Sequence, residues 1–323
     1  MTPLIRRPRL GLALGGGGIR GLAHIGILSV LEREGIRPAV LAGTSMGGLV
    51  AAAYAVGLSP EALTQEVSEF THLRRLLMLM DFAPARRGLL QGDRVRSFLI
   101  DKLGKNTTFA DLSIPLGLVA VDIDNGEEVV LTQGPLVDAV LATCAVPGVF
   151  SPVRWGDRYL SDGGILNNVP ADVPRRLGAE VVIAVDVGPE FGPRQTETKA
   201  HAHRGPSAAR GSQAPGFLPP QARDLYQSYL IMAHAATQDR LRHAHPDLVL
   251  RPEIPADITA FSGFSRAVEP IRAGEREAKT HIAMVREVVK PGLRLFSVEQ
   301  RPSRLRGRGS APIAGPGLHE GMT

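Results

Sequence analysis

The sequence has few of the residues from which disulfide scaffolds, metal centres and aromatic surfaces are built. It holds one cysteine, Cys144, among 323 residues, so no intramolecular disulfide can form, which fits a reducing compartment. Aromatic residues make up 5% of the chain and hydrophobic residues 44%, so we expect a large aliphatic core. No cysteine, histidine or carboxylate cluster has metal-ligand spacing, and the sequence predicts neither a metal nor another cofactor.

The chain also lacks a hydrophobic run with the properties of an export signal or a membrane span. The apolar run behind the basic start covers only residues 10–14, whereas a signal core has about 7–15 residues. The longest uncharged run, residues 38–60, is interrupted by the turn-forming centre Gly43-Thr44-Ser45, so we reject a span there. These absences favour a cytoplasmic protein with, at most, a peripheral membrane contact.

The excess of positive charge lies in two segments rich in proline, glycine and serine. The formal net charge is +5, and residues 190–221 and 294–323 contribute +2 and +3 of it. Because the remainder is neutral, we expect no basic face and no nucleic-acid partner. The predicted organisation is a basic N-terminal tail at 1–9, one domain at 10–293 with a mobile insert at 188–220, and an Arg/Gly/Pro-rich tail at 294–323.

The order of apolar runs predicts an α/β fold. Residues 10–14 form a continuous apolar run, typical of a strand buried on both faces, and residues 22–34 have helical spacing before Gly35. A second strand at 39–42 and a small-residue helix at 49–56 follow, which is the order of parallel strands joined by helices. Hairpins are predicted at 116–132 and 153–160, strands at 181–187 and 247–250, and helices at 59–70, 92–103, 135–144, 170–177, 224–242 and 269–289.

The turn after the second strand carries a candidate nucleophile, Ser45. Gly43 and Gly47 lie two residues before and after it, which removes crowding at a tight strand-to-helix turn. The hydroxyl would stand at the carboxyl edge of the sheet and at a helix N-terminus, where negative charge is favoured. An ordinary glycine-rich turn is the alternative interpretation.

The glycine run after the first strand admits two interpretations. Gly16, Gly18 and Gly21 match the dinucleotide fingerprint G-x-G-x-x-G, but the second strand ends in the serine turn and not in the acidic residue that would bind a ribose. Successive glycine N–H groups can instead bind an oxyanion. A third motif, Asp162-Gly163-Gly164, places a candidate proton acceptor after the second hairpin, unless Asp162 only caps the following turn.

These three motifs, in this order, resemble the patatin-like phospholipase family, bacterial branch, over about residues 10–187, with a weaker match at 247–252. The resemblance implies a three-layer α/β/α fold with a mainly parallel central sheet and a serine hydrolase of phospholipids or related lipids. It implies a dyad of Ser45 as nucleophile and Asp162 as base. By the same resemblance, the oxyanion hole comprises Gly16, Gly17, Gly18 and Arg20, and the motif glycines are Gly21, Gly43, Gly47, Gly163 and Gly164.

Two other functions stay open from the sequence. A Ser-Asp-His esterase or thioesterase would need a late histidine, for which His243 and His245 are candidates without a supporting motif. A non-catalytic lipid- or nucleotide-binding regulator is the second. For the dyad, the unperturbed pKa of the aspartate base is about 3.9, which burial would raise and nearby N–H donors would lower. We therefore expect no activity loss near pH 6.5 of the kind that an imidazole base would impose.

Lipid contact is expected from residues 70–90, where leucines and methionines alternate with arginines. A core helix with a solvated face is the alternative. The expected partner is a lipid substrate, and the sequence does not indicate an oligomeric state.

Overall fold

The computed structural model describes residues 6–70, 93–189, 191 and 220–291. The predicted lipid-contact stretch at 70–90 falls almost wholly outside these residues, as do most of the insert at 188–220 and the C-terminal tail at 294–323. The division into a domain and tails therefore stays a prediction.

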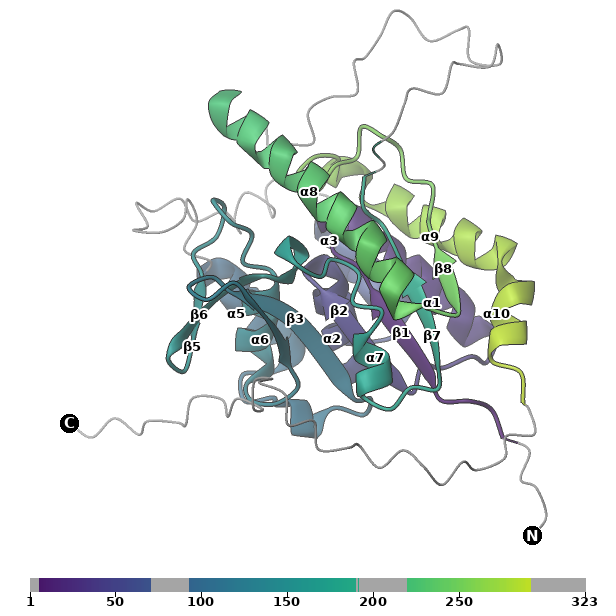
Figure 1. Ribbon diagram of the computed structural model, residues 1–323. Helices are drawn as coiled ribbons and strands as arrows, with labels where there is room; N and C mark the ends of the chain where they lie inside the picture. Colours follow the sequence, from purple (N-terminus) through teal and green to yellow (C-terminus); the bar gives the residue numbers. More distant parts are fainter. Residues whose placement is uncertain (1–5, 71–92, 190, 192–219, 292–323) are drawn as a thin grey trace, which may run out of the picture.

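One mixed sheet of eight strands runs through the molecule in the order β5-β6-β3-β2-β1-β7-β8, with β4 added to β3 (Figure 1). Neighbouring strands are parallel from β3 through β2, β1 and β7 to β8, and the hairpin strands β4, β5 and β6 are antiparallel. The strands are β1 (Leu10–Leu14), β2 (Val40–Thr44), β3 (Leu116–Asp122), β4 (Glu127–Leu131), β5 (Val153–Trp155), β6 (Arg158–Asp162), β7 (Val181–Val185) and β8 (Leu248–Leu250).

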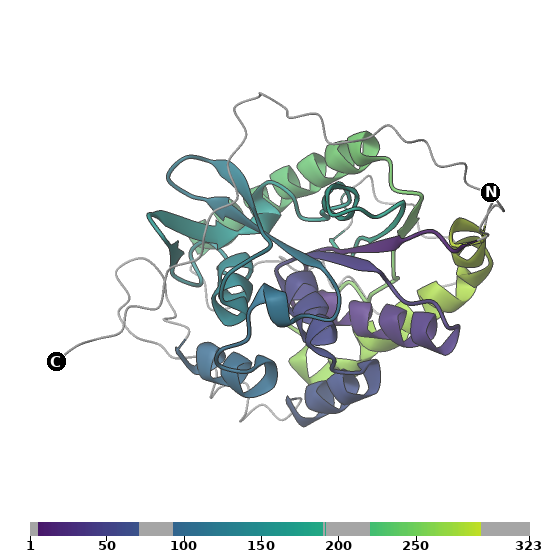
Figure 2. The same cartoon turned by 90° about the horizontal axis from the view of Figure 1, so that it is seen from below.

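Helices cover both faces of this sheet, which confirms the predicted three-layer α/β/α architecture with a mainly parallel sheet. Figure 2 shows α7 and α8 on one face and α1, α2, α3, α5, α6 and α9 on the other. The helices are α1 (Ala23–Arg33), α2 (Met46–Val56), α3 (Pro60–Phe70), α5 (Asp93–Leu103), α6 (Leu136–Thr143), α7 (Val173–Arg176), α8 (Pro220–Ala244), α9 (Val268–Thr280) and α10 (Ile282–Val288). Short 3₁₀ turns are η1 (Gly18–Leu22), η2 (Phe109–Asp111), η3 (Gly163–Ile165) and η5 (Phe264–Arg266).

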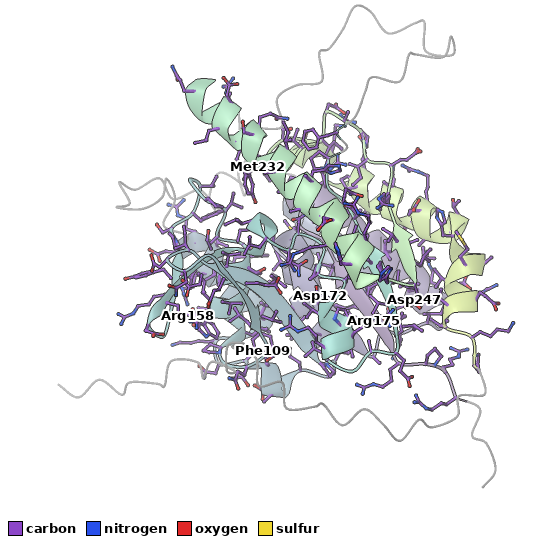
Figure 3. The ribbon with its side chains drawn as sticks, in the orientation of Figure 1. Phe109, Arg158, Asp172, Arg175, Met232 and Asp247 are labelled. Atoms are coloured by element: carbon purple, nitrogen blue, oxygen red, sulfur yellow. The ribbon has the colours of Figure 1, made fainter. Side chains whose placement is uncertain are left out.

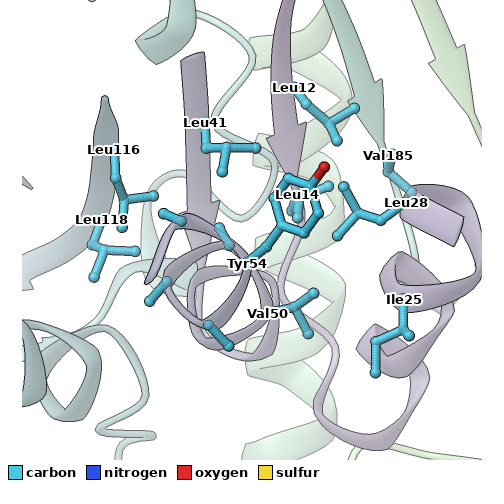
Figure 4. Packing of buried hydrophobic residues seen from close by; sticks show 14 of the residues in the cluster. Leu12, Leu14, Ile25, Leu28, Leu41, Val50, Tyr54, Leu116, Leu118 and Val185 are labelled. Carbon is cyan, nitrogen blue, oxygen red and sulfur yellow. The ribbon is translucent and has the colours of Figure 1, made fainter. Parts of the chain in front are cut away.

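The apolar strands divide their side chains between two unequal layers. In β1, Leu12 and Leu14 lie in the main core with Leu28 and Tyr54 from the helices (Figure 4). Ala13, on the opposite face of the strand, belongs to a smaller cluster beneath α7 and α8. Alternation within a fully apolar run therefore places large side chains under one helix layer and small ones under the other.

Close approach of two helices holds the first helix in place. A Cβ at Gly26 of α1 would lie 2.0 Å from the Ile271 carbonyl oxygen of α9, and a Cβ at Gly274 would lie 1.9 Å from the Ala23 carbonyl oxygen. Glycines at both positions let the two backbones touch. Helix α1, which follows the glycine loop, is thereby fixed against the C-terminal part of the chain.

Two predicted helices differ from the structure. The helix expected at 170–177 is reduced to the single turn α7, because residues 170–172 form turns ahead of it. The helix expected at 269–289 is interrupted at His281, whose φ of −99° and ψ of 7° separate α9 from α10. This bend leaves Val285 of α10 fully buried.

Side-chain pairs join distant parts of the sheet layer. Arg175 of α7 and Asp247, just before β8, lie side by side, with 2.7 Å between Arg175 Nη2 and Asp247 Oδ2 (Figure 3).

Among the described helices, none is both long enough and apolar enough to span a membrane.

Candidate active site

Ser45 stands at a sharp turn between β2 and α2. Its φ of 53° and ψ of −127° form a strained conformation that residues other than glycine rarely adopt. A Cβ at Gly47 would lie 2.2 Å from the Leu14 carbonyl oxygen, and one at Gly43 would lie 2.6 Å from the Gly47 carbonyl oxygen. Both motif glycines are therefore needed for space, and they leave Ser45 at the N-terminus of α2.

Thr143, at the end of α6, holds the backbone of this turn. The Ser45 N–H donates to Thr143 Oγ1 at 3.0 Å, and the Thr143 hydroxyl donates in turn to the Val119 carbonyl oxygen of β3. The side chain is fully buried. Sequence analysis missed this residue, because nothing local to Thr143 indicates a contact with a turn about 100 residues earlier.

Asp162 ends β6, and the sheet register brings it to Ser45. Strands β2 and β6 both pair with the edge of β3 that β4 does not occupy. Along that edge, Thr44 pairs with Val119 and Asp162 pairs with Ala120. The two strands therefore meet end to end, and the residue that follows Thr44 lies against Asp162.

The Asp162 carboxyl is almost fully buried, with 3% of the residue exposed. Its Oδ1 accepts the Gly164 N–H at 2.8 Å. Burial raises the pKa of Asp162 to about 6, although the Gly164 N–H and the neighbouring Ser45 hydroxyl both favour its ionised form. A carboxyl with this pKa titrates near pH 6, which differs from the expectation that an aspartate base would cause no activity loss near pH 6.5.

The glycine loop after β1 lies directly beside Ser45, since a Cβ at Gly16 would lie 3.1 Å from Ser45 Cβ. The Gly16 N–H donates to the Asn168 carbonyl oxygen at 3.0 Å, and the Asn168 side-chain amide donates to the Gly16 carbonyl oxygen at 3.2 Å. Gly16 is therefore not an available oxyanion donor, contrary to the sequence prediction. In the described part of the chain, no acceptor meets the N–H groups of Gly17 and Gly18.

Arg20 has a different role from the one predicted. Its guanidinium is buried and donates to the carbonyl oxygens of Val187 at 2.7 Å, Ile258 at 3.1 Å and Gly188 at 3.2 Å. These bonds tie the glycine loop to the chain after β7 and to the segment before α9. Arg20 therefore holds the loop in place, because its guanidinium N–H groups donate to these three backbone carbonyls.

The motif glycine Gly21, next to Arg20, leaves space for the Met46 side chain. A Cβ at Gly21 would lie 2.6 Å from Met46 Cγ.

His24 of α1 supports the same loop through a hydrogen bond to its backbone. Its Nε2 lies 2.7 Å from the Gly15 carbonyl oxygen, and its Nδ1 has no partner among the described residues. Complete burial lowers the pKa of His24 to about 4. The ring is therefore neutral at ordinary pH, with its proton on Nε2 to meet the carbonyl.

Ser45 and Asp162 open into a cavity of about 340 Å³. Its apolar walls include Val95, Val146, Val149, Phe150, Phe261 and Phe264. Its polar lining includes Asn168 from the loop after η3, Asp186 after β7, and Tyr226 and Tyr229 from α8. Sequence analysis assigned none of these four residues to the site, and only the three-dimensional packing of α8 reveals the two tyrosines.

The two histidines proposed for a triad lie away from this cavity. The His243 side chain is 78% exposed, and its Nδ1 lies 2.9 Å from the Asp239 carbonyl oxygen of its own helix. His245 is also exposed. His234 of α8 does line the cavity, where its ring contacts Phe191 at a centroid distance of 5.3 Å. In the described structure, the Asp162 carboxyl accepts a hydrogen bond from the Gly164 N–H and from no histidine.

Comparison with known proteins identifies the family of the chain. The sequence profile of the family described as patatin-like phospholipase matches residues 12–175. The chain belongs to the patatin-like phospholipase family. An uncharacterized NTE family protein of Mycobacterium tuberculosis is 36% identical over 193 residues, which cover 58% of this chain and 51% of the relative. The neuropathy target esterase sws of Drosophila melanogaster is 33% identical over 183 residues, which cover 55% of this chain and 13% of that protein.

This patatin-like chain thus spans about half the length of the curated mycobacterial relatives it matches, and less of the fly protein. Among solved structures, VipD from Legionella pneumophila superimposes with a TM-score of 0.53 at 13% identity, covering 88% of this chain and 67% of VipD. At that identity the likeness concerns the fold alone. It extends beyond the segment matched by the family profile.

Proposed function

We propose that this protein is a serine acyl hydrolase that cleaves ester bonds of phospholipids or related lipids, in the manner of a phospholipase A or lysophospholipase. One observation carries the proposal: a serine in a strained strand-to-helix turn and a buried carboxyl, whose ionised form the serine hydroxyl favours, line the same apolar cavity. Membership of the patatin-like phospholipase family supports it.

In the first half of the reaction, Ser45 attacks the ester carbonyl carbon and its proton passes to Asp162. A base with a pKa of about 6 is mostly ionised at pH 7 and still binds a proton well enough to accept one from a hydroxyl. The Gly17 and Gly18 N–H groups, together with the N-terminus of α2, are the proposed donors to the oxyanion.

In the second half, protonated Asp162 returns its proton to the departing alcohol oxygen as the tetrahedral intermediate collapses. An acyl group then remains on Ser45. Water attacks this acyl-enzyme, Asp162 accepts a proton from the water, and collapse releases the fatty acid while the proton returns to Ser45. One carboxyl thus serves as base and acid in turn, and no histidine is required.

The cavity is suited to an aliphatic acyl chain, because its walls are mainly valine and phenylalanine side chains.

We also propose a peripheral contact with a lipid surface, through α8, the helix that forms one side of the cavity. Leu225 and Met232 of α8 are 73% and 65% exposed, and residues 225–238 contain no charged side chain. Leu225→Ser with Met232→Ser should weaken sedimentation with vesicles while leaving hydrolysis of a soluble short-chain ester unchanged; equal sedimentation would refute the contact.

The alternatives are less well supported. A triad would place a histidine between Ser45 and Asp162, whereas the sheet register brings these two residues next to each other and His243 and His245 lie outside the cavity. A non-catalytic nucleotide-binding regulator would use the glycine loop for phosphates, yet the Asp162 and Asp186 carboxyls face the same cavity and would repel them.

The proposal is tested by labelling with a fluorophosphonate and by hydrolysis of lipid esters, with Ser45→Ala as the matched variant. We expect the label on Ser45, and a loss of kcat of about 10⁴–10⁶-fold in the variant. Circular dichroism of both proteins checks that the fold is kept. Labelling at another residue, or an alanine variant that keeps most of its activity, would refute the proposal.

A further inference from the structure

Two of the four tyrosines of the chain face the dyad from α8. Tyr226 and Tyr229 both line the cavity, and α8 packs against η3, the turn that follows Asp162. The other two tyrosines, Tyr54 of α2 and Tyr159 of β6, do not belong to the cavity wall. The mechanism described above uses neither Tyr226 nor Tyr229, although both lie beside its reacting groups.

The Tyr229 hydroxyl converges with two site oxygens on one point. A Cβ placed on Gly164 would lie 3.3 Å from Tyr229 Oη, 3.1 Å from Asp162 Oδ1 and 3.0 Å from Asn168 Oδ1. The Cβ position of Gly164 is empty in the native chain. These three oxygens therefore surround the same small space next to the carboxyl that exchanges protons with Ser45.

Both phenols remain protonated whenever the dyad can work. Burial raises the pKa of Tyr229 and of Tyr226, and the negative charge of Asp162 raises both further. A protonated phenol is a hydrogen-bond donor as well as an acceptor. Arg20, which also lines the cavity, has its guanidinium directed at three backbone carbonyls. The Tyr229 hydroxyl is thus well placed to donate to a group that develops charge beside Asp162.

Packing fixes the position of these hydroxyls. The Tyr226 ring lies between Tyr229 and Phe261, at centroid distances of 5.7 Å and 5.9 Å. Further along α8, Arg240 pairs with Glu128 of β4 at 2.6 Å, so the C-terminal half of the helix is tied to the sheet layer. A donor held in this way loses little conformational freedom when it binds a ligand.

We propose that Tyr229 forms a leaving-group subsite, in which its hydroxyl donates a hydrogen bond to the departing oxygen of an aliphatic alcohol ester such as a glyceryl ester, and that Tyr226 positions it. This inference rests on the proposed hydrolase activity. When the tetrahedral intermediate collapses, the bond between the acyl carbon and the alcohol oxygen breaks, and that oxygen takes its bonding electron pair. Asp162 supplies the proton, and Tyr229 shares its hydrogen without losing it.

The need for such a donor depends on the leaving group. An aliphatic alkoxide is strongly basic, so a second hydrogen-bond donor accelerates its departure. A p-nitrophenolate leaves as a stable anion, and the same donor accelerates its departure only slightly. The subsite therefore predicts a selective defect, which a merely structural role for Tyr229 would not produce.

The experiment compares Tyr229→Phe with the wild-type protein on two esters of one acyl chain, 1-octanoylglycerol and p-nitrophenyl octanoate. We expect kcat/KM to fall by about 10–100-fold on the glyceryl ester and by less than about threefold on the aryl ester. The larger loss corresponds to the free energy of one hydrogen bond to a charged group. Tyr226→Phe, which keeps the supporting ring, should remain within about threefold on both. Tyr54→Phe removes a phenol hydroxyl outside the cavity and serves as the control for folding.

Each outcome decides the matter. Equal losses on the two esters, no loss on either, or a selective loss in Tyr226→Phe instead would overturn the assignment of Tyr229. A wild-type protein that hydrolyses neither ester and does not react with a fluorophosphonate would refute the hydrolase proposal itself, and the subsite with it. An active wild-type protein with an unselective Tyr229→Phe variant refutes the subsite only.

Discussion

Ser45 and Asp162 lie next to each other because the strands that lead to them occupy consecutive stretches of one edge of β3. The approach of these two residues thus depends on sheet register, although they come from distant parts of the chain. Since a register shift of one residue would turn each side chain to the opposite face, the pairing of β3 fixes the site geometry.

The first prediction concerns pH. Asp162 must be ionised to accept the serine proton, and its pKa is raised to about 6, so kcat/KM should fall about tenfold per unit as the pH drops below 6. The profile is measured with a soluble ester. His234→Ala should leave it unchanged, and a shift of the midpoint in that variant would assign the titration to histidine.

The second prediction concerns stability. The folded-state pKa of Asp162 lies above its unfolded value, so the folded protein loses stability as the pH rises from about 4 through 6. Asp162→Asn removes this penalty and should be more stable than the wild-type at pH 7 by roughly 1–3 kcal/mol, with a smaller gain at pH 4. Its activity should fall by several orders of magnitude.

Urea denaturation at the two pH values measures this difference. Asp124→Asn, at an exposed turn position, is the matched control and should change the free energy of unfolding by less than about 0.5 kcal/mol. If Asp162→Asn were less stable than the wild-type at pH 7, the prediction would be wrong. Interactions of the carboxylate would then outweigh the free-energy cost of burying its charge.

The third prediction concerns Thr143. Thr143→Val keeps the shape but leaves the Ser45 N–H and the Val119 carbonyl without their partner, at a cost of about 1–3 kcal/mol of stability. Because the turn then shifts, kcat should fall by at least about tenfold. Thr143→Ser retains the hydroxyl and should behave nearly as the wild-type. If both variants were equally impaired, packing of the methyl group would explain the role of Thr143.

The fourth prediction concerns the proposed oxyanion donors. A Cβ at Gly17 would lie 2.9 Å from Val187 Cγ2, so Gly17→Ala should displace the loop and lower kcat by about 10²–10³-fold, the effect of losing one oxyanion donor. Val187→Ala opens that space, and the double variant should recover part of the lost activity. An unchanged kcat in Gly17→Ala would contradict the assignment.

The fifth prediction is that no histidine takes part in the chemistry. His234→Ala, His243→Ala and His245→Ala should each retain activity within about threefold of the parent. The measurement is kcat/KM for one ester in all three variants, with thermal melting as the check of folding. A folded histidine variant as inactive as Ser45→Ala would replace the dyad by a triad.

Much of the fold follows from local patterns in the sequence. Each of the eight strands was predicted within a few residues, because buried apolar runs, Gly-containing turns and helix-ending glycines are local signals. The break at His281 was missed, since no proline or glycine marks it and packing of Val285 decides it.

The site was less accessible to prediction. The candidate residues Ser45 and Asp162 lie in recognisable local motifs, but Thr143, Asn168 and Tyr229 line or support the candidate site through contacts with segments far away in sequence. The hydrogen bonds of Gly16 and Arg20 likewise depend on residues after position 165, so sequence alone could not show that these groups already have partners.

The contact between α1 and α9 sets the length of chain needed to produce a folded protein. The family profile ends at residue 175, but a fragment cut there would lose β7 and expose one edge of β1 to aggregation. It would also lose α9, whose backbone touches α1 at Gly26, and would leave the Arg20 guanidinium without its three carbonyl partners. Recombinant expression should therefore extend at least through α9, well past the signature by which the family is identified.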